Sequence, residues 1–565
     1  MGGGAQPIGR GYFKAALAET PREAFNWRFY YCVLNFGLMG AARGLDEGLI
    51  GTTVTQKSFI KQSGLSTAAG LTAAEVAQKT GNITAMVQIG SVLGALIAFT
   101  FSDRIGRLWA TRELCTVWII GAIVFLTSNG SYGQVLAGRF IMGCGIGQTT
   151  VVAPSYLAEI SPRSVRGVAV CAFTGSVYVG IMLGYFANYG TSLHIGVKSL
   201  QWIAPQSMHI IFAGIIFIMS FFALESPRWL MRADRIEDAA MTMSKLRNLD
   251  VEDPYVRAEL TDIQDQLSRE RAATAGNTFT RPFKELFTLP RNRYPLVLAL
   301  MLQLLGQWSG ANSVTIYAPA YFAILGIKGS SEGLLATGVL GVVKLLSALT
   351  CAFFLVDFLG RKRALSIGIC IQFISMLYIA ITLTSIPVLT SAAAKTGSVH
   401  LTSMQRHAST GAIVFVYFSG VGWALGYNSI QYLLSAEVFP LGVRSLGQSL
   451  VMCFHFVNQY GNSKAVPLML LSTENGGITS AGTFWFFAVV TGLGGAFVWF
   501  FMPETAGKSL EGMDELFSLP WHQIGRKGAK LTAGKGSMLE SLATAGGAKE
   551  FEMMHVEHAE EHSKA

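Results

Sequence analysis

The chain has 565 residues, of which 51% are apolar and only 14% are charged, and its mean hydropathy is +0.43. This composition argues against a soluble globular domain and is typical of a chain that crosses the lipid bilayer several times. The net charge of +9 comes from basic residues dispersed over several loop edges, so a nucleic-acid partner is not expected.

Runs of about 20 apolar residues predict twelve membrane-spanning helices. The first six are predicted at residues 28–50, 82–101, 113–130, 132–155, 168–189 and 207–224. The second six are predicted at residues 294–323, 333–356, 364–386, 409–434, 447–470 and 482–502. The fold class that follows is an all-α membrane protein.

Three polar segments flank these spans. The first 27 residues are Gly-rich and polar and do not resemble a cleaved signal. The segment between the sixth and seventh spans contains two charged runs that predict amphipathic helices. The predicted parts are an N-terminal tail (1–27), a first set of helices (28–224), a helical linker (225–293), a second set of helices (294–502) and a polar C-terminal tail (503–565).

Basic residues are concentrated in alternate short loops, at Arg104, Arg107, Arg112, Arg163, Arg166, Arg361, Lys362 and Arg363. Loops rich in arginine and lysine stay on the cytosolic side of a membrane. The pattern therefore predicts that both termini and the linker are cytosolic. We expect a multi-pass protein of the plasma membrane.

A short charged motif occurs once in each half of the chain. Residues 102–107 read Ser-Asp-Arg-Ile-Gly-Arg, and residues 357–362 read Asp-Phe-Leu-Gly-Arg-Lys, each between two predicted spans. Such a repeat at corresponding places of two halves is typical of transporters built from internal repeats. We expect both turns to lie at the same membrane face, where their charges can hold neighbouring helix ends together.

With these turns, the chain resembles the sugar porter branch of the major facilitator superfamily along nearly its whole length. The fourth span contains Gly-Arg-Phe-Ile-Met-Gly-Cys-Gly-Ile-Gly at residues 138–147, followed by Tyr-Leu-Ala-Glu-Ile-Ser-Pro at 156–162. Glu-Ser-Pro-Arg-Trp-Leu follows the sixth span at residues 225–230. The second half has Ala-Glu-Val-Phe-Pro at 436–440 and Pro-Glu-Thr at 503–505.

The resemblance implies two six-helix bundles around a central site, which rock between outward-facing and inward-facing states. Charged residues at the cytosolic helix ends can pair when that side is closed and separate when it opens. These candidate gate residues are Asp103, Arg107, Glu159, Arg166, Glu225, Arg228, Asp357, Arg361, Glu437 and Arg444. The alternative is that they only anchor the topology.

Five ionisable residues are predicted inside spans, namely Asp46, Glu47, Arg139, Lys344 and His455. A charge there costs about 2.5–3.5 kcal/mol unless it has a partner or a wet cavity. Asp46 occupies the acidic position of a first-span motif of the family, opposite the arginine that Arg139 matches. The resemblance implies that this pair carries a coupling proton, with a static ion pair as the alternative. Glu47 is expected to face the outer mouth.

The seventh span predicts the substrate site. Residues 303–319 contain glycines and a proline that are expected to break the helix beside a wet cavity. They resemble the family's sugar-binding pattern, in which Gln307, Asn312 and Tyr317 match. Amide and phenol groups suit sugars because they hydrogen-bond to hydroxyl groups. Further candidates are Thr174, Lys344, Tyr432, His455, Asn458 and Gln459.

Departures from the family pattern affect the substrate prediction. Thr174, Gly306 and Ile316 replace residues of the hexose-binding set, so the prediction extends beyond a hexose to a pentose, a deoxyhexose or a sugar acid. Lys344 lies roughly 20 Å along its helix from Asp357, at mid-membrane depth. It could bind a substrate carboxylate, reach toward the interface or pair with another helix. A neutral monosaccharide is favoured, and a sugar acid or quinate-like acid stays open.

The sequence shows no phosphate-binding loop, nucleophile elbow or metal-ligand spacing, so neither an enzyme nor a cofactor nor a metal site is predicted. The favoured prediction is a monomeric proton symporter that imports a monosaccharide, with the lipid bilayer as its other partner. An uncoupled facilitator and a sugar sensor on the same fold are alternatives. Asp46 argues against the first, and the short C-terminal tail argues against the second.

Overall fold

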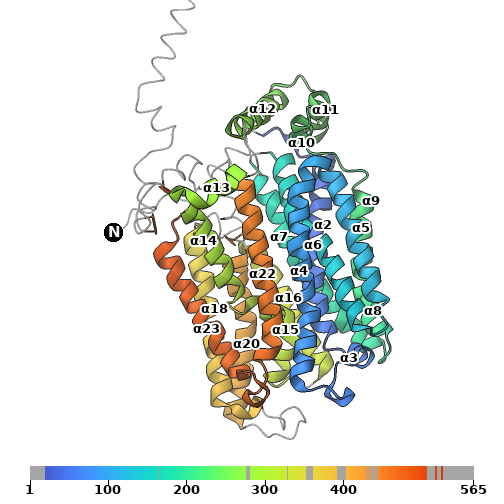
Figure 1. Cartoon of the computed structure of the whole chain (residues 1–565), viewed down its shortest axis with the longest axis vertical. Helices are drawn as coiled ribbons and strands as arrows, with labels where there is room; N and C mark the ends of the chain where they lie inside the picture. The colour runs from blue at the N-terminus through green and yellow to red at the C-terminus, as the bar shows by residue number, and fades with distance from the viewer. Residues whose placement is uncertain are drawn as a thin grey trace, which may run out of the picture.

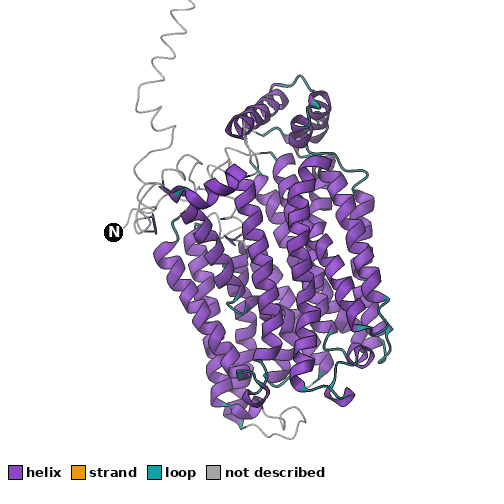
Figure 2. Ribbon diagram, in the orientation of Figure 1, coloured by secondary structure: helices purple, strands orange, loops and turns teal. Residues whose placement is uncertain are grey.

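In the computed structural model of the chain, the described residues are 20–162, 164–274, 280–327, 329–351, 360–390, 402–428 and 443–504, together with 430, 431, 434, 438, 439, 516, 517, 524 and 525. All regular elements among these residues are helices (Figure 2). The long helices lie side by side, and three helices of the linker cover one end of the first half, namely α10 (Pro227–Arg232), α11 (Ile236–Arg247) and α12 (Pro254–Thr274) (Figure 1). The predicted all-α fold is confirmed.

The first half supplies six helical segments. They are α2 (Trp27–Thr53), α4 (Ala73–Ile105), α5 (Arg107–Leu126), α6 (Tyr132–Ile160), α7 (Arg166–His194) and the pair α8 (Leu200–Gln206) and α9 (Met208–Met219). The helix α4 begins well before its predicted span because Thr72 and Glu75 form a capping box at its N-terminus. The sixth span is interrupted at Ser207.

The linker and the second half follow. The linker contains α10 (Pro227–Arg232), α11 (Ile236–Arg247), α12 (Pro254–Thr274) and α13 (Thr280–Thr288), so the prediction of helices there is confirmed. The second half contains α14 (Pro290–Gln307), α15 (Ala311–Ile324), α16 (Ser330–Thr350), α18 (Arg361–Ser385), α20 (Ser403–Leu425), α22 (Arg444–Met469) and α23 (Thr479–Phe501). The seventh predicted span is therefore two helices, α14 and α15.

Nine helical segments in the described part of the chain are long and apolar enough to cross a membrane. The three other predicted spans are α2, the broken pair α14 and α15, and α22. The α2 helix carries charges in its middle, the seventh span is broken, and α22 is rich in amides. Polar spans of this kind are tolerated where they line a cavity. With them the fold has the twelve membrane helices that the sequence predicts.

Glycines bring α2 and α7 into close contact. A Cβ atom on Gly44 would lie 1.9 Å from the Val177 carbonyl oxygen, which is closer than any side chain can approach. Gly40 and Gly48, one turn away on either side, meet the α7 backbone in the same way. Small residues at such contacts allow helices to pack closely in a membrane. This packing fixes the rotation of α2 and so positions its charged turn, residues 43–47.

Candidate functional site

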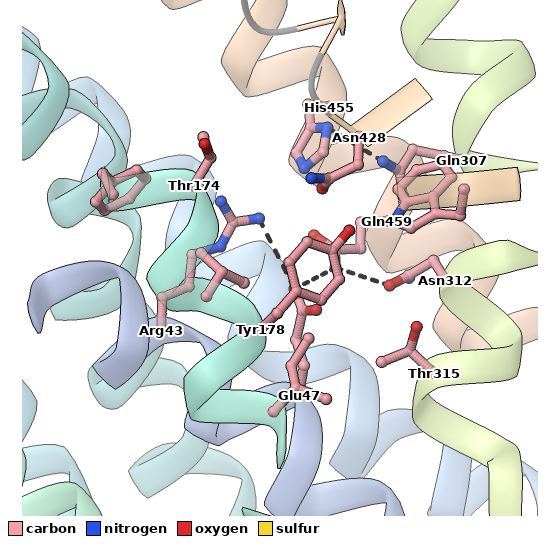
Figure 3. Close-up of a pocket in the computed structure, with 14 residues that line it drawn as sticks. Arg43, Glu47, Thr174, Tyr178, Gln307, Asn312, Thr315, Asn428, His455 and Gln459 are labelled. Carbon is pink, nitrogen blue, oxygen red and sulfur yellow. Dashed lines mark hydrogen bonds and ion pairs between the residues drawn. The ribbon is translucent and has the colours of Figure 1, made fainter. Parts of the chain in front are cut away.

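A cavity lies between the two halves, at the level where α14 ends and α15 begins (Figure 3). Its lining residues are Arg43, Glu47, Phe173, Thr174, Val177, Tyr178, Ile181, Gln307, Asn312, Thr315, Trp423, Asn428, His455 and Gln459. The enclosed space is about 40 Å³, which holds only a few water molecules. A larger ligand therefore requires these side chains to move apart.

The break in the seventh span places amide side chains at the cavity. The α14 helix ends at Gln307, and Gly310 adopts a left-handed conformation with φ +88° immediately before α15. Glycine adopts this conformation without the steric cost that a Cβ atom would bring. Gln307 and Asn312 therefore project into the cavity from the two sides of the break (Figure 3). The predicted break beside a polar site is confirmed.

Two amide atoms in the lining are buried without a hydrogen-bond partner among the described residues, Gln307 Oε1 and Asn312 Nδ2. The other amide atom of each side chain has a hydrogen-bond partner. Gln307 Nε2 lies 3.2 Å from His455 Nδ1, and Asn312 Oδ1 accepts from Gln459 Nε2 at 3.2 Å. One acceptor and one donor in the lining are therefore available to a ligand.

The lining includes five of the predicted substrate residues, namely Thr174, Gln307, Asn312, His455 and Gln459. Lys344 lies directly behind the lining, because it is buried in α16 and its Nζ donates to Thr315 Oγ1. Tyr432 lies outside the described residues.

Tyr317 and Asn458 are not among the lining residues and bond elsewhere. The Tyr317 hydroxyl bonds to Thr84 Oγ1 at 2.7 Å and donates to the Ser463 carbonyl at 2.5 Å. Asn458 Oδ1 accepts from Trp308 Nε1 at 3.1 Å. Tyr317 therefore connects α4 of the first half to α22 of the second, and a direct role of either residue in substrate binding stays a prediction.

Two charged residues of α2 line the cavity, Arg43 and Glu47. Arg43 Nη2 lies 3.8 Å from Glu47 Oε1, one helical turn away, and the two side chains are 8% and 13% exposed. The Arg43 guanidinium also lies over the Phe456 ring, 5.5 Å from its centroid. Glu47 Oε1 accepts from Gln459 Nε2 at 3.1 Å. The expectation that Glu47 faces the outer mouth is wrong, since packing against α7 turns it toward α22.

The structure brings Asp46 and Arg139 together. Both are buried, and Arg139 Nη1 donates to Asp46 Oδ1 while Nη2 lies 3.4 Å from Oδ2. Arg139 also donates to the carbonyl oxygens of Ile83 and Thr84, at 3.1 and 3.4 Å. His209 of α9 is fully buried beside them, with Nε2 3.8 Å from Asp46 Oδ1. The pairing is as expected, and its role in coupling stays a prediction.

The candidate gate residues of the first half form a charged network beside the linker. Arg107 pairs with Asp103 (Nη1–Oδ1, 2.7 Å) and with Glu159 (Nη2–Oε1, 2.8 Å). Asp103 also accepts from Arg232 of α10, at 2.7 Å. This network ties the ends of α4, α5 and α6 to the first linker helix. Arg228 instead donates to Gln266 of α12 at 3.2 Å.

A carboxylate caps the helix that follows each repeated Gly-Arg turn. Glu225 accepts from the first two backbone N–H groups of α5, at 3.0 and 3.2 Å, and Glu504 accepts from the first two of α18, at 2.9 and 3.2 Å. Gly106 and Gly360, the residues before these helices, have φ of +95° and +82°. Negative charge is favourable at a helix N-terminus. Burial raises the pKa of the Glu225 carboxyl, against the opposing effect of its N–H donors.

The remaining gate candidates belong to the second half of the chain, except Arg166 of α7. Asp357 and Glu437 are outside the described residues, and the side chain of Arg444 is as well, although its backbone begins α22. Arg361 begins α18, and Arg166 is exposed at the start of α7. The described network therefore belongs to the first half.

Sequence reasoning missed Arg43 and His209. The signal for Arg43 was present, because an arginine well inside a 27-residue membrane helix needs a partner as much as an acid does. His209 lay at the edge of the span predicted at residues 207–224, where an imidazole is unremarkable. Tyr178 and Trp423 gave no signal, since aromatic residues are common in apolar spans.

Comparisons with known proteins agree with this architecture. The family model described as "Sugar (and other) transporter" matches residues 32–517. The quinate permease of Neurospora africana is 32% identical over 508 residues, which cover 88% of this chain and 90% of that protein. The quinate permease of Neurospora terricola is 32% identical over 516 residues, with 90% and 92% covered.

Solved structures show the same fold. The xylose transporter XylE from E. coli, in a partially occluded inward-open conformation, has a TM-score of 0.69 at 21% identity, over 86% of this chain and 100% of that chain. The proton:xylose symporter XylE bound to 6-bromo-6-deoxy-D-glucose has a TM-score of 0.69 at 22% identity, over 87% and 99% of the two chains. At this identity the likeness concerns the fold, and it confirms the two-bundle arrangement.

Proposed function

This chain belongs to the sugar transporter family of the major facilitator superfamily, and on that premise we propose that it is a proton-coupled symporter that takes up a small polyhydroxylated solute by alternating access. The observation that carries the proposal is the buried pair of Asp46 and Arg139 between α2 and α6. Ionised groups inside a membrane are costly, and their presence is by default a sign of function.

Protonation of Asp46 changes this pair in a defined way. The acid loses its charge, and Arg139 then depends on the carbonyl oxygens of Ile83 and Thr84, which already accept from its guanidinium. A cycle that alters the surroundings of the pair can therefore load a proton from one side of the membrane and release it on the other.

Hydrogen bonds connect this pair to the contact between the halves. The carbonyl of Thr84 faces Arg139, and its hydroxyl bonds to Tyr317 of α15. Tyr317 in turn donates to Ser463 of α22. A shift of Arg139 on protonation thus has a continuous route to the interface that opens and closes.

The side chains that line the cavity suit two classes of solute. A neutral monosaccharide suits the orphaned amide atoms of Gln307 and Asn312 and the aromatic faces of Tyr178 and Trp423, and one similar structure is named a proton:xylose symporter. A polyhydroxy acid suits the same amides together with Arg43, and the similar curated proteins are named quinate permeases. Both classes present several hydroxyl groups.

The charged network beside the linker serves, in this proposal, to keep the first bundle rigid. Its described ion pairs join Arg107 to Asp103 and Glu159, and Asp103 to Arg232. Helix ends held in this way move as one unit when the bundle rocks. The proposal retains a plasma-membrane location with both termini cytosolic.

The proposal is tested by uptake into intact yeast cells that lack their own hexose carriers and express this chain. Labelled xylose, glucose and quinate are offered with and without a protonophore. We expect at least one solute to accumulate above its external concentration and the accumulation to collapse with the protonophore. Uptake without accumulation would identify an uncoupled facilitator, and no uptake at normal surface expression would favour a sensor.

The Asp46→Asn variant tests the assigned coupling residue. We expect it to lose uphill accumulation and to keep the exchange of labelled for unlabelled substrate, because exchange does not require proton release. Asp238→Asn is the matched control, since Asp238 is exposed in α11 and pairs with Arg235 at 2.8 Å. Uphill accumulation that survives in Asp46→Asn contradicts the assignment.

A further inference from the structure

His209 lies beside the buried ion pair of Asp46 and Arg139. It is fully buried in α9, two residues after the interruption at Ser207, and neither of its ring nitrogens has a hydrogen-bond partner among the described residues. Its Nε2 lies 3.8 Å from Asp46 Oδ1, which is beyond hydrogen-bond distance. A buried polar group without a partner costs free energy, so this conformation does not use the imidazole fully.

The ion pair provides the charged groups that face His209. From α2, Asp46 lies next to its Nε2, and Arg139 of α6 donates to the same Asp46 oxygen. From α5, the ring of Trp118 faces the imidazole, with the two centroids 5.9 Å apart. The Trp118 ring has no acid or base, so protonation near His209 depends on the pair.

The other ionisable side chains of the helices around α9 have partners of their own. On α2, Tyr31 Oη donates to the Met219 carbonyl at the far end of α9, whereas Arg43 and Glu47 line the cavity. On α5, the described contacts of the charged residues are Arg112 with Ser220, Glu113 with Gln148, and Arg107 with Asp103 and Glu159.

Protonation of Asp46 creates a hydrogen-bond donor that Arg139 cannot satisfy. A neutral carboxyl group carries one O–H, and a guanidinium has donors but no acceptor. A neutral imidazole has one acceptor nitrogen, and no hydrogen bond within the described chain fixes which nitrogen of His209 that is. Nε2 can therefore accept from Asp46, and a shift of about 1 Å brings the two atoms within bonding distance.

We propose that His209 is the positioning residue that holds the coupling proton on Asp46, because its Nε2 accepts a hydrogen bond from the protonated carboxyl. The proton stays on the Asp46 oxygen, the imidazole stays neutral, and Arg139 is left with the carbonyl oxygens of Ile83 and Thr84. The inference rests on the proposed proton-coupled transport and gives its coupling acid a second partner.

The two partners of Asp46 favour opposite protonation states. Arg139 favours the ionised carboxylate through its positive charge, and His209 favours the neutral acid by accepting from its O–H. Arg139 also contacts the Thr84 carbonyl, and the Thr84 hydroxyl bonds to Tyr317 of the other half. A motion of the halves that draws Arg139 toward Thr84 therefore passes Asp46 from one partner to the other.

The test compares substitutions that keep or remove an acceptor at position 209. His209→Gln keeps an acceptor oxygen, whereas His209→Phe and His209→Leu keep apolar bulk without one. Initial uptake of labelled xylose, glucose and quinate into the yeast cells is measured against external pH and divided by the amount of protein at the cell surface. His194→Phe is the control, because His194 is exposed at the end of α7.

We expect His209→Phe and His209→Leu to need a proton concentration roughly 10-fold higher for half-maximal uptake, which is a pH about one unit lower. The protonated carboxyl loses its acceptor in these variants and is less stable. His209→Gln and His194→Phe should stay close to wild type. A merely structural role of His209 would lower uptake at every pH without moving the pH of half-maximal uptake.

A second measurement follows Asp46 in the purified protein and does not depend on uptake. Infrared difference spectra between neutral and acidic pH contain the C=O stretching band of each carboxyl group that becomes protonated. The Asp46 band is the one that Asp46→Asn removes. Loss of the acceptor for its O–H moves this band to higher frequency, which we expect in His209→Phe and not in His209→Gln.

An unchanged pH of half-maximal uptake or an unchanged Asp46 band in His209→Phe would overturn the role of His209 and leave the proposed function standing. Equal shifts in His209→Gln and His209→Phe would also overturn it, since an acceptor would then make no difference. Wild-type uptake that responds to neither the protonophore nor external pH would overturn the proposed function, and this inference with it. Variants below half of wild-type surface expression are judged by the infrared band alone.

Discussion

Gln307 and Asn312 each use one amide atom within the protein and present the other to the cavity. Asn462 of α22 is divided in the same way, since its Nδ2 donates to the Gln307 carbonyl at 2.9 Å and its Oδ1 has no partner among the described residues, but Asn462 does not line the cavity. The partly used amides of the lining are the residues on which substrate hydroxyls should depend.

Truncation of either amide should therefore weaken substrate binding without loss of expression. A hydrogen bond to a neutral group contributes about 0.5–1.5 kcal/mol net, so Gln307→Ala and Asn312→Ala should each weaken the apparent affinity roughly 2- to 12-fold. The half-saturation concentration for uptake is the measurement. Gln134→Ala is the control, because Gln134 lies at the start of α6, does not line the cavity and donates to the Val124 carbonyl of α5. Unchanged half-saturation in both variants would place the substrate elsewhere.

Among the helices, α2 determines the chemistry of the cavity through its rotation. Asp46 faces Arg139 and His209, whereas Arg43 and Glu47 face the cavity. One helix therefore contributes both to the buried ion pair and to the charged lining of the cavity. The glycine contacts with α7 fix this rotation, because they leave no room for a side chain on that face of α2.

The Gly44→Ala substitution tests this contact. Its methyl group would meet the Val177 carbonyl at 1.9 Å, so the helices must separate, and overpacking of this kind costs about 1–3 kcal/mol. We expect a lower melting temperature for the purified protein and reduced uptake. Gly190→Ala in α7 is the matched control, since no atom lies within 4 Å of its Cβ position. Equal melting temperatures for the two variants would show that the contact is not tight.

At the scale of the whole molecule, the linker contacts the first bundle through apolar and polar residues. Leu246 of α11 is buried in the core of the first half, and Arg247 Nη1 donates to the Ile160 carbonyl at 2.9 Å. Arg232 pairs with Asp103 at 2.7 Å, with side chains 52% and 35% exposed, and Trp229 Nε1 donates to the Asp103 carbonyl at 2.9 Å. Exposed ion pairs contribute about 0–1 kcal/mol, so the pair of Arg232 and Asp103 is one of the weaker contacts between the linker and the bundle.

Arg232→Ala should release α10 from the end of α4. We expect a protease to cut the linker roughly two- to fivefold faster, because the loss of an exposed ion pair worth up to about 1 kcal/mol raises the population of the locally open linker by that factor. Arg235→Ala is the control, because Arg235 pairs with Asp238 inside the linker and not with the bundle. A similar rate in both variants would mean that Arg232 does not hold the linker.

Properties that depend on neighbouring residues in the chain were determined by the sequence alone. Apolar runs, the linker helices, the Gly-induced break before Asn312 and the repeated Gly-Arg turns are of this kind, and the structure agrees with each of them where it is described. The pairing of Asp46 with Arg139 could be predicted from the sequence, because the family resemblance places the two residues opposite each other and a charge inside a membrane needs a partner.

Only the tertiary structure decided which polar side chains meet. The placement of Arg43 and Glu47 in the cavity depends on the rotation of α2 against α7, and the contact of Glu47 with Gln459 joins residues 412 positions apart. Tyr317 matches a sugar-binding position but bonds to Thr84 and Ser463, because α15 packs against α4 and α22 at that level. Helix rotation and packing between distant segments leave no periodic signal in the chain, since they depend on how helix surfaces fit together.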